Sequence, residues 1–362
     1  MKIGIVGLPN VGKSTLFNAL TKSKSAMAAN YPFCTIDPNV GVVEVPDARL
    51  QKLVELVKPQ KTIPAIVEFV DIAGLVKGAS EGEGLGNQFL AHIRECDAIS
   101  QVVRVFSDGN VIHVHGNVDP KRDMEVLETE LILADLQTVQ KRLAKAKSDA
   151  KSGDKKKSAY AALVERIEKM LMEGKKVIDA EFTPEEQIDI KDLHLLTAKP
   201  LLYIANVSEN EAKDFDVEAF KKNLGLNPSQ KVIPISAKIE EELGALSDEE
   251  AKMFLADLGL KETGLNGLIR AAYETLNLMT YFTAGEKEVR AWTIHKGDKG
   301  PQAAGVIHTD FEKGYICAET IGYEDFVQVG SEQAAKEKGF MRTEGKEYVV
   351  KDGDIMHFRF NN

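Results

Sequence analysis

The sequence contains no run of about 18 uncharged apolar residues, which is the length that a membrane-spanning helix needs. After Lys2, only four apolar or small residues precede a glycine-rich stretch, so the pattern of a secretory leader is also missing. The three cysteines, Cys34, Cys96 and Cys317, are far apart and form neither a CxxC motif nor a Cys/His zinc-ligand pattern. We therefore expect no membrane contact and a reducing, cytoplasmic environment.

The composition does not identify a partner by its charge. The 362 residues include 46 Lys or Arg and 56 Asp or Glu, a formal net charge of −10, which gives no whole-protein sign of nucleic-acid binding. Hydrophobic residues make up 43% and charged residues 28%, as in ordinary globular proteins. At roughly 100 to 200 residues per domain, the length predicts two or three domains.

One segment reverses the overall charge. Residues 137–176 contain twelve Lys or Arg and five Asp or Glu, a local charge of +7. Apolar residues follow the three- and four-residue spacing of packed helices in two strips. The first strip is Ile132, Leu136, Val139, Leu143, Ala146 and Ala150, and the second is Tyr160, Leu163, Ile167 and Met170. A polar connector separates them, so we predict an antiparallel helical hairpin with a basic tip. This charge is either a solvated surface or a contact for RNA or the ribosome, because seven excess positive charges can engage several phosphates.

The most specific local motif is a phosphate-binding loop at residues 7–14, GLPNVGKS, which matches GxxxxGK[ST]. It lies between an apolar strand pattern at residues 3–6 and a helical pattern at residues 15–21. In such a loop, backbone N–H groups surround the phosphates, Lys13 neutralises β- and γ-phosphate oxygens, and the Ser14 hydroxyl ligates Mg²⁺. We therefore predict a nucleoside triphosphate site. Its nucleotide-contacting residues are Asn10, Val11, Gly12, Lys13, Ser14 and Thr15.

A second nucleotide motif follows the apolar strand pattern at residues 65–70. Asp71 to Gly74 fit DxxG, in which the Asp approaches Mg²⁺ and the Gly N–H touches the γ-phosphate. Thr35 lies between the two motifs and is the candidate for a second hydroxyl ligand that binds Mg²⁺ only in the triphosphate state. The predicted metal ligands are therefore Ser14, Thr35 and Asp71.

The base-reading motif of GTPases, NKxD, is absent. The strand pattern at residues 201–205 runs instead into Asn206–Glu209, which reads NVSE. Glu209 is one methylene longer than Asp, which displaces its carboxylate by about 1.5 Å, and Val207 stands in place of the Lys, so the fit to guanine should weaken. Asn206 and backbone groups near it can read adenine instead. The loop expected over the base is Ser236, Ala237 and Lys238.

These motifs together resemble the YchF/Obg-like ATPases of the Obg branch of translation-factor G proteins. The most specific part is residues 71–89, DIAGLVKGASEGEGLGNQF, whose glycines look like the Obg signature. The NxxE at residues 206–209 is similar to the YchF-like branch. The segment from about residue 281 to residue 354 is similar to a TGS domain, a small β-grasp-like module.

The resemblance implies an α/β fold in three parts. A P-loop NTPase G domain with a mostly parallel sheet is expected at residues 1–280, interrupted by the helical hairpin at about 124–198, and an α+β TGS domain at residues 281–362. Spacing supports the insertion, because 135 residues separate Asp71 from Asn206 whereas two βα repeats need only about 60.

The resemblance also implies a function. It indicates a slow, Mg²⁺-dependent ATPase that hydrolyses ATP to ADP and phosphate and acts as a translation-related switch on the ribosome. We expect a monomer that contacts the ribosome or structured RNA through the basic hairpin and the TGS domain. The alternatives are a GTP-binding protein, or a nucleotide-gated RNA- or ribosome-binding module in which hydrolysis is incidental.

The glutamine that positions water in Ras-like enzymes is missing, because Leu75 follows the DxxG motif. Three substitutes remain open. A neutral His113 can orient water, with His115 and His92 as alternatives. In related G proteins an Asn at the position of Asn10 can recruit K⁺, which acts where an arginine finger would, and the third substitute is a group that the ribosome supplies. The predicted catalytic residues are therefore Lys13, Asn10 and His113.

Overall fold

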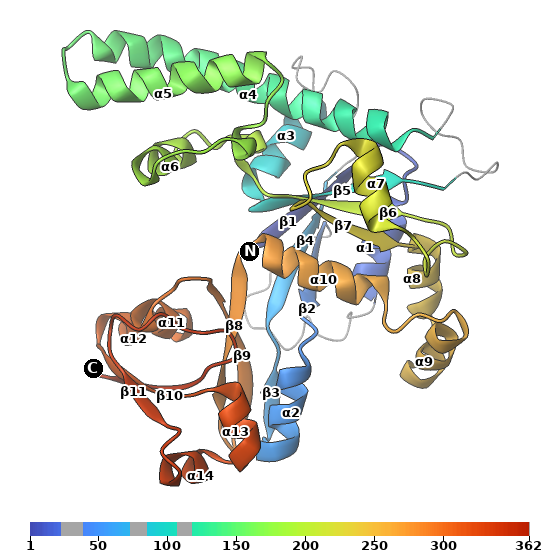
Figure 1. The fold of residues 1–362 in the computed structure, drawn as a ribbon, viewed down its shortest axis with the longest axis vertical. Coiled ribbons are helices and arrows are strands. Elements are labelled where there is room, and N and C mark those ends of the chain that lie inside the picture. Colours follow the sequence, from blue (N-terminus) through green and yellow to red (C-terminus); the bar gives the residue numbers. More distant parts are fainter. Residues whose placement is uncertain (23–38, 73–84, 107–117, 362) are drawn as a thin grey trace. The chain divides into compact units, whose positions relative to one another are not determined.

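The computed structural model describes residues 1–22, 39–72, 85–106 and 118–361 (Figure 1). The chain divides into two compact units. The first unit is Met1–Val42 with Glu68–Leu268, and the second unit is Val43–Val67 with Ile269–Asn362. None of the helices in the described part of the chain is long and apolar enough to cross a membrane.

The first unit is built on a six-stranded sheet in the order β2-β4-β1-β5-β6-β7. Its strands are β1 (Lys2–Gly7), β2 (Val40–Glu44), β4 (Ile66–Asp71), β5 (Ala98–Arg104), β6 (Leu201–Asn206) and β7 (Lys231–Ile235). Its helices outside the hairpin are α1 (Lys13–Lys22), α3 (Leu85–Glu95), α7 (Val217–Leu224), α8 (Ala237–Leu243) and α9 (Asp248–Asp257), and α10 (Gly264–Thr275) leads into the second unit. Strands β4, β1, β5, β6 and β7 pair in parallel, which confirms the predicted P-loop G-domain fold.

The sheet brings the predicted nucleotide motifs to one edge. Every residue of β5 is buried, as expected for a parallel strand that helices cover on both faces. The carboxyl ends of parallel strands lie at the same edge, so Gly7, Asp71, Asn206 and Ile235 end their strands on one side of the unit. This edge is where open α/β sheets bind ligands.

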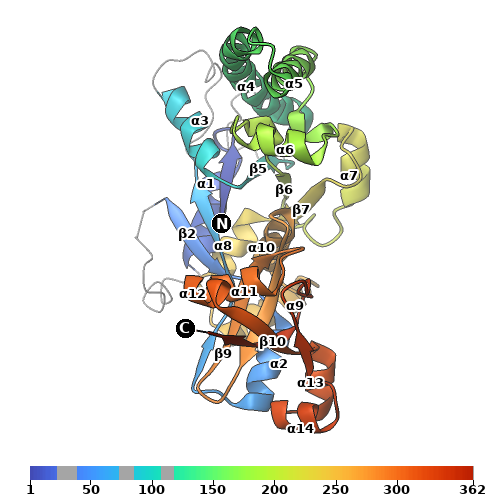
Figure 2. The ribbon, with the colours of Figure 1, turned by 90° about the vertical axis from the view of Figure 1, so that its left-hand side faces the viewer.

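The predicted helical hairpin is confirmed between β5 and β6. It consists of α4 (Pro120–Ala150) and α5 (Lys155–Met172), which lie side by side in both views (Figures 1 and 2). Asp119 and Asp154 begin the two helices by accepting backbone N–H groups, and Gly153 turns the chain between them with φ of 78°. The apolar strips meet in a core that includes Val139, Leu143, Leu163, Val164, Ile167 and Leu171.

A buried acidic side chain, Asp135, fixes the base of the hairpin. The chain returns to β6 through η3 (Val177–Asp179), α6 (Pro184–Lys191) and η4 (Leu196–Ala198). The carboxylate of Asp135 accepts hydrogen bonds from the Leu196 N–H at 2.8 Å and from the N–H and hydroxyl of Thr197 at 2.7 Å each. Burial raises the pKa of Asp135, and these donors oppose that rise.

A second contact connects the hairpin to β6, the strand that ends at the predicted base-reading motif. Glu128 of α4 accepts a hydrogen bond from the Tyr203 hydroxyl at 2.8 Å and forms an ion pair with Lys176, also at 2.8 Å. The hairpin is therefore fixed to the sheet that carries the site.

The second unit contains another six-stranded sheet, in the order β11-β10-β12-β8-β9-β3. Its strands are β3 (Lys61–Ile63), β8 (Leu278–Ala284), β9 (Glu288–His295), β10 (Tyr315–Ile321), β11 (Arg342–Glu344) and β12 (Ile355–Phe360). Its helices are α2 (Ala48–Val57), α11 (Gly300–Ile307), α12 (Thr309–Lys313), α13 (Tyr323–Val329) and α14 (Glu332–Glu337). The core on one face of this sheet includes Met279, Tyr281, Ile294, Ala303, Ala318 and Phe358.

The unit boundaries differ from the domain boundaries expected from the sequence. Residue 281 falls inside β8, and residues 43–67 belong to the second unit, where β3 pairs in parallel with β9. Arg49 of α2 hydrogen-bonds to Asp47 and to Asp352 at 2.9 Å, and its guanidinium lies 5.4 Å from the ring centre of Phe282. The contact between Arg49 and Asp352 joins residues 303 positions apart, which no local pattern reveals. The three-part layout at residues 1–280, 124–198 and 281–362 stays a prediction.

Candidate functional site

The phosphate loop joins β1 to α1 in a conformation that needs small or flexible residues. Asn10 and Gly12 have positive φ values of 64° and 93°. A Cβ on Gly7 would lie 2.9 Å from Val11 Cγ2 and 3.0 Å from the Val102 carbonyl oxygen, which is too close. The loop leads directly into α1, whose first N–H groups form the kind of site that binds phosphate.

Lys13 and Asp71 are brought together from two different strand ends. The Lys13 Nζ forms an ion pair with Asp71 Oδ1, and the two side chains are only 10% and 22% exposed. In this partly buried place the attraction is stronger than on an open surface. The Lys13 ammonium and the carboxylate of Asp71, the predicted metal ligand, thus neutralise each other.

The donor set at this place fits Mg²⁺. Ser14 follows Lys13 in the first turn of α1 and is exposed, so its hydroxyl is accessible, and Lys13 itself contacts Asp71. Hydroxyl and carboxylate oxygens are the hard ligands that Mg²⁺ prefers, together with phosphate oxygens and water. The other predicted residues of this region, Thr35, Gly74 and His113, lie outside the described residues.

Asn206 connects the phosphate loop to the loop after β7. Its Nδ2 donates to the Val11 carbonyl at 2.8 Å, and its Oδ1 accepts from the Ala237 N–H at 3.1 Å. The side chain is buried, and a Cβ on Gly12 would collide with its Nδ2. Asn206 therefore holds two nucleotide loops together, a role that the sequence reading, which expected it to read the base, did not foresee.

Val207 is a core residue that follows the end of β6. It is 1% exposed, its N–H donates to the Ile235 carbonyl at 2.9 Å, and its side chain packs in a core cluster with Val103, Met124 and Tyr203. An apolar side chain at the end of a buried strand gains more from the core than from an exposed edge, so the Val207 side chain stabilises the packing around β6.

The loop after β7 also serves the fold. Ser236 is buried and caps α8 by accepting the Ile239 N–H. Lys238 is exposed, and its Nζ lies 2.9 Å from Glu209 Oε2. The side chains of Glu209 and Lys238 are 41% and 65% exposed, so both are accessible from solvent.

Glu240 is a buried acid beneath this loop that the sequence analysis did not identify. Its Oε1 accepts the Gly264 N–H at 2.7 Å at the start of α10, and the side chain is 4% exposed. Burial raises the pKa of Glu240 to about 7, against the lowering effect of hydrogen bonds from Gly264 and Leu265. One Glu in a charged helix carries no sequence signal for such a place.

The parallel sheet, the phosphate loop and the Lys13–Asp71 pair define a P-loop nucleoside triphosphatase of the G-protein type. Two family models agree with this class. The model described as 50S ribosome-binding GTPase matches residues 2–134, and the model YchF-GTPase_C, described as a protein of unknown function, matches residues 278–361.

Two curated relatives specify the family. The Ribosome-binding ATPase YchF of Bacillus subtilis is 56% identical over 361 residues, covering 99% of this chain and 98% of the relative. The protein of the same name from Escherichia coli O157:H7 is 54% identical over 360 residues, covering 99% of both. This chain belongs to the YchF family.

Solved structures agree with the fold. The YchF GTPase of Schizosaccharomyces pombe has a TM-score of 0.90 at 43% identity, covering 99% of this chain and 97% of that one. A GTP binding protein from Pyrococcus horikoshii OT3 has a TM-score of 0.63 at 22% identity, covering 100% of both chains, and supports the fold alone.

Proposed function

We propose that this protein is a Mg²⁺-dependent ATPase that hydrolyses ATP to ADP and phosphate and acts as a translation-related switch on the ribosome. The observation that carries the activity is the phosphate loop with Lys13 facing Asp71. The relatives at 54% and 56% identity are named as ribosome-binding ATPases, which supports both the nucleotide and the partner. The cytoplasm, where ribosomes work, is the proposed location, and a monomer is the proposed state.

The mechanism begins with an exchange of partners at Lys13. When ATP binds, the Lys13 ammonium leaves Asp71 for phosphate oxygens, and the Asp71 carboxylate becomes available as a ligand. Ser14 and Asp71 would hold Mg²⁺, which supplies neutralising charge to the phosphates, and we propose Thr35 as the further ligand. The N–H groups at the start of α1 orient the phosphates.

The orientation of the attacking water is the second part of the mechanism. We propose His113 for this role, and K⁺ held through Asn10 as the additional positive charge near the phosphates. A group supplied by the ribosome is the third source, and it would make intrinsic turnover slow.

The base-binding end of the site favours adenine because it weakens the binding of guanine. The Glu209 carboxylate faces Lys238 at 2.9 Å, so guanine would have to compete with an ammonium for it. A mismatched hydrogen bond at a binding site costs on the order of 1 to 3 kcal/mol. We therefore propose ATP as the preferred nucleotide.

The hairpin tip is the proposed contact for ribosomal RNA. Its paired cations include Lys147, which lies 2.6 Å from Glu165. Other hairpin lysines are exposed and have no ion pair among the described residues: Lys141, Lys145, Lys151, Lys155, Lys156 and Lys157. The last three occupy the first turn of α5, where the helix dipole disfavours positive charge, so they do not stabilise this helix. A hairpin tip whose cations reduce the stability of its own helix is suited to binding a polyanionic partner.

The activity is tested by measuring phosphate release from ATP with Mg²⁺, with and without purified ribosomes. We expect slow turnover of the free protein, faster turnover with ribosomes, and none for Lys13→Ala. Hydrolysis by Lys13→Ala at the wild-type rate would show that the phosphate loop is not the active site. Turnover that ribosomes leave unchanged would favour a binding module with incidental hydrolysis.

The hairpin contact is tested by replacing Lys155, Lys156 and Lys157 together with Ala and titrating ribosome binding against salt. Each lost phosphate contact should reduce the slope of log affinity against log salt by about 0.7 to 0.9, so the triple variant should lose about 2 to 3. Lys147→Ala is the matched control, because its charge is already paired. An equal slope for the triple variant and the control would contradict the contact.

A further inference from the structure

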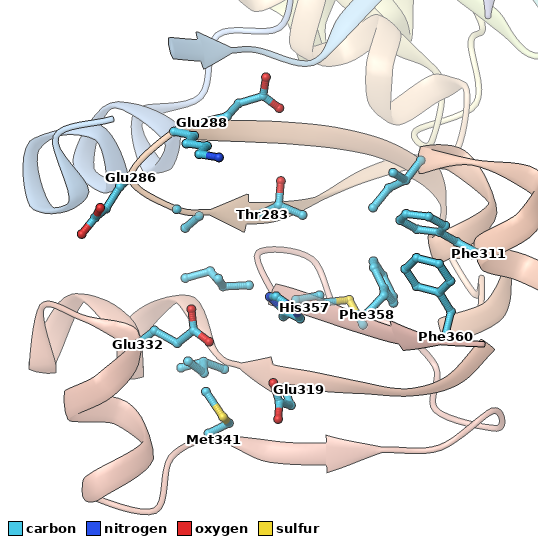
Figure 3. Close-up of a pocket in the computed structure, with 17 residues that line it drawn as sticks. Thr283, Glu286, Glu288, Phe311, Glu319, Glu332, Met341, His357, Phe358 and Phe360 are labelled. Atoms are coloured by element: carbon cyan, nitrogen blue, oxygen red, sulfur yellow. The ribbon is translucent and has the colours of Figure 1, made fainter. Parts of the chain in front are cut away.

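A cavity of about 590 Å³ opens in the second unit between the end of the β8–β9 hairpin and β12 (Figure 3). All of its lining residues belong to the second unit, and none of them takes part in the nucleotide site described above. Its size lies within the range of sites that bind ligands or peptide segments.

The cavity exists because two neighbouring strands separate. β8 pairs with β9 along its whole length and β12 pairs with β10 along its own, but β8 and β12 pair only at Phe282 and Ile355. After that pair, no strand of the described residues adjoins this edge of β12. An edge of this kind is a template for another strand.

The open edge of β12 offers backbone hydrogen bonds to the cavity. The Asp354 carbonyl accepts the Phe282 N–H at 2.8 Å, so residue 354 directs its backbone groups toward β8. In a strand, every second residue does the same, which turns the backbone groups of Phe358 and Phe360 toward the cavity side. A bound extended segment can pair with these groups.

The lining combines apolar side chains with an excess of acids. Phe311 and Phe360 stack with ring centres 3.8 Å apart at one end, as Figure 3 shows. Toward the other end lie Glu286 and Glu332, which are exposed. Their carboxylates and that of Glu288 form no ion pair among the described residues. Glu319, the fourth acid of the lining, pairs with Arg359, and the lining contains one lysine, Lys287.

We propose that this cavity binds an extended, Lys- or Arg-containing peptide segment of a partner protein. Its backbone adds to the open edge of β12, its apolar side chains enter the cavity, and its cations face the acidic side chains. The acids disfavour RNA here, because unpaired carboxylates repel phosphates. Strand addition of this kind obtains affinity from the main chain and specificity from alternate side chains.

The test uses the full-length protein and a fluorescein-labelled nine-residue peptide that alternates Lys and Val, measured by fluorescence anisotropy. We expect saturable binding that is lost when alternate backbone nitrogens of the peptide are methylated. The same peptide with Glu in place of Lys should bind at least about tenfold more weakly. Equal binding of the acidic peptide, or of the methylated one, would overturn the proposal.

Matched variants locate the binding. Glu286→Lys and Glu332→Lys should each weaken the basic peptide by roughly three- to tenfold, and Met341→Trp should block it by filling the cavity. Glu324→Lys is the control, because Glu324 is exposed on α13 and does not line the cavity. The methyl NMR signals of the core of the second unit verify that each variant is folded. The proposal fails if Glu324→Lys weakens binding as much as Glu286→Lys does, or if a nine-nucleotide RNA binds in a manner that Met341→Trp blocks.

Discussion

Replacing Asn206 with Ala should remove the hydrogen bonds that join the phosphate loop to the loop after β7. The substitution changes no side chain that is proposed to contact the phosphates. In the wild type, the side-chain amide donates to the Val11 carbonyl at 2.8 Å and accepts the Ala237 N–H at 3.1 Å. Val11 and Ala237 are 1% and 6% exposed, so water does not readily replace the lost partner. The variant therefore leaves one buried carbonyl and one buried N–H without hydrogen bonds.

The magnitude follows from those two groups. A buried polar group left unpaired costs about 1 to 3 kcal/mol, which gives about 2 to 6 kcal/mol for the pair. Water that enters the space of the missing amide can satisfy part of this, so we expect about 2 to 4 kcal/mol. Domains are stable by only about 5 to 15 kcal/mol, so the loss should be large enough to loosen the site locally.

Hydrogen exchange measures this effect at the place where it arises. Because the two units need not unfold together, we prefer the exchange rate of the Ala237 amide to a global unfolding curve. A loss of about 2 to 4 kcal/mol predicts exchange faster by roughly 30- to 1,000-fold, and ATP binding weaker by at least about tenfold in calorimetry. Asn18→Ala is the control, because Asn18 is exposed on α1. The same exchange rate and ATP affinity in both variants would refute the proposed connection.

Three further predictions concern phosphate binding, pH and cations. Lys13→Ala should abolish ATP binding in calorimetry, because it removes the phosphate-facing cation and leaves Asp71 unpaired, and wild-type affinity would contradict the site. Glu240 has a pKa of about 7 when folded against 4.5 otherwise, so the folded state retains a proton that the unfolded chain releases. The free energy of unfolding should therefore fall as pH rises from about 4.5 to 7, by up to about 1.4 kcal/mol per pH unit. Glu240→Gln should make this fall smaller, which urea titrations of both proteins at pH 5 and pH 7.5 measure. An equal fall in the wild type and the variant would refute the prediction. Exchanging K⁺ for Na⁺ should slow ATP hydrolysis if Asn10 organises a cation, and equal rates would remove K⁺ from the mechanism.

Features set by local sequence could be predicted. The apolar strand at residues 3–6, the GxxxxGK[ST] loop and the start of α1 follow one another in the chain, so the order of residue types suffices. The hairpin could also be predicted, because apolar residues recur every three or four positions in α4 and α5, which is the pattern of helices that pack on each other. Both features depend on residues that are neighbours in sequence.

Features set by distant contacts could not be predicted. β3 has only three residues, two of them exposed, and joins the second sheet solely by pairing with β9. Val207 aligns with a base-reading position, yet packing around β6 makes it a core residue. Glu209 is unusual for its position in the motif, which the sequence shows. Its ion pair with Lys238 could not be predicted, because the fold brings the two loops together.

The equilibrium affinities for ATP and GTP, measured side by side with Mg²⁺, test the central claim most directly. The wild type should bind ATP more tightly, and Glu209→Asp should narrow the difference by restoring the shorter carboxylate of a guanine site. Val207 is left unchanged in this comparison, because a Lys there would place a charge in the core. Tighter binding of GTP by the wild type would contradict the assignment of this protein as an ATPase.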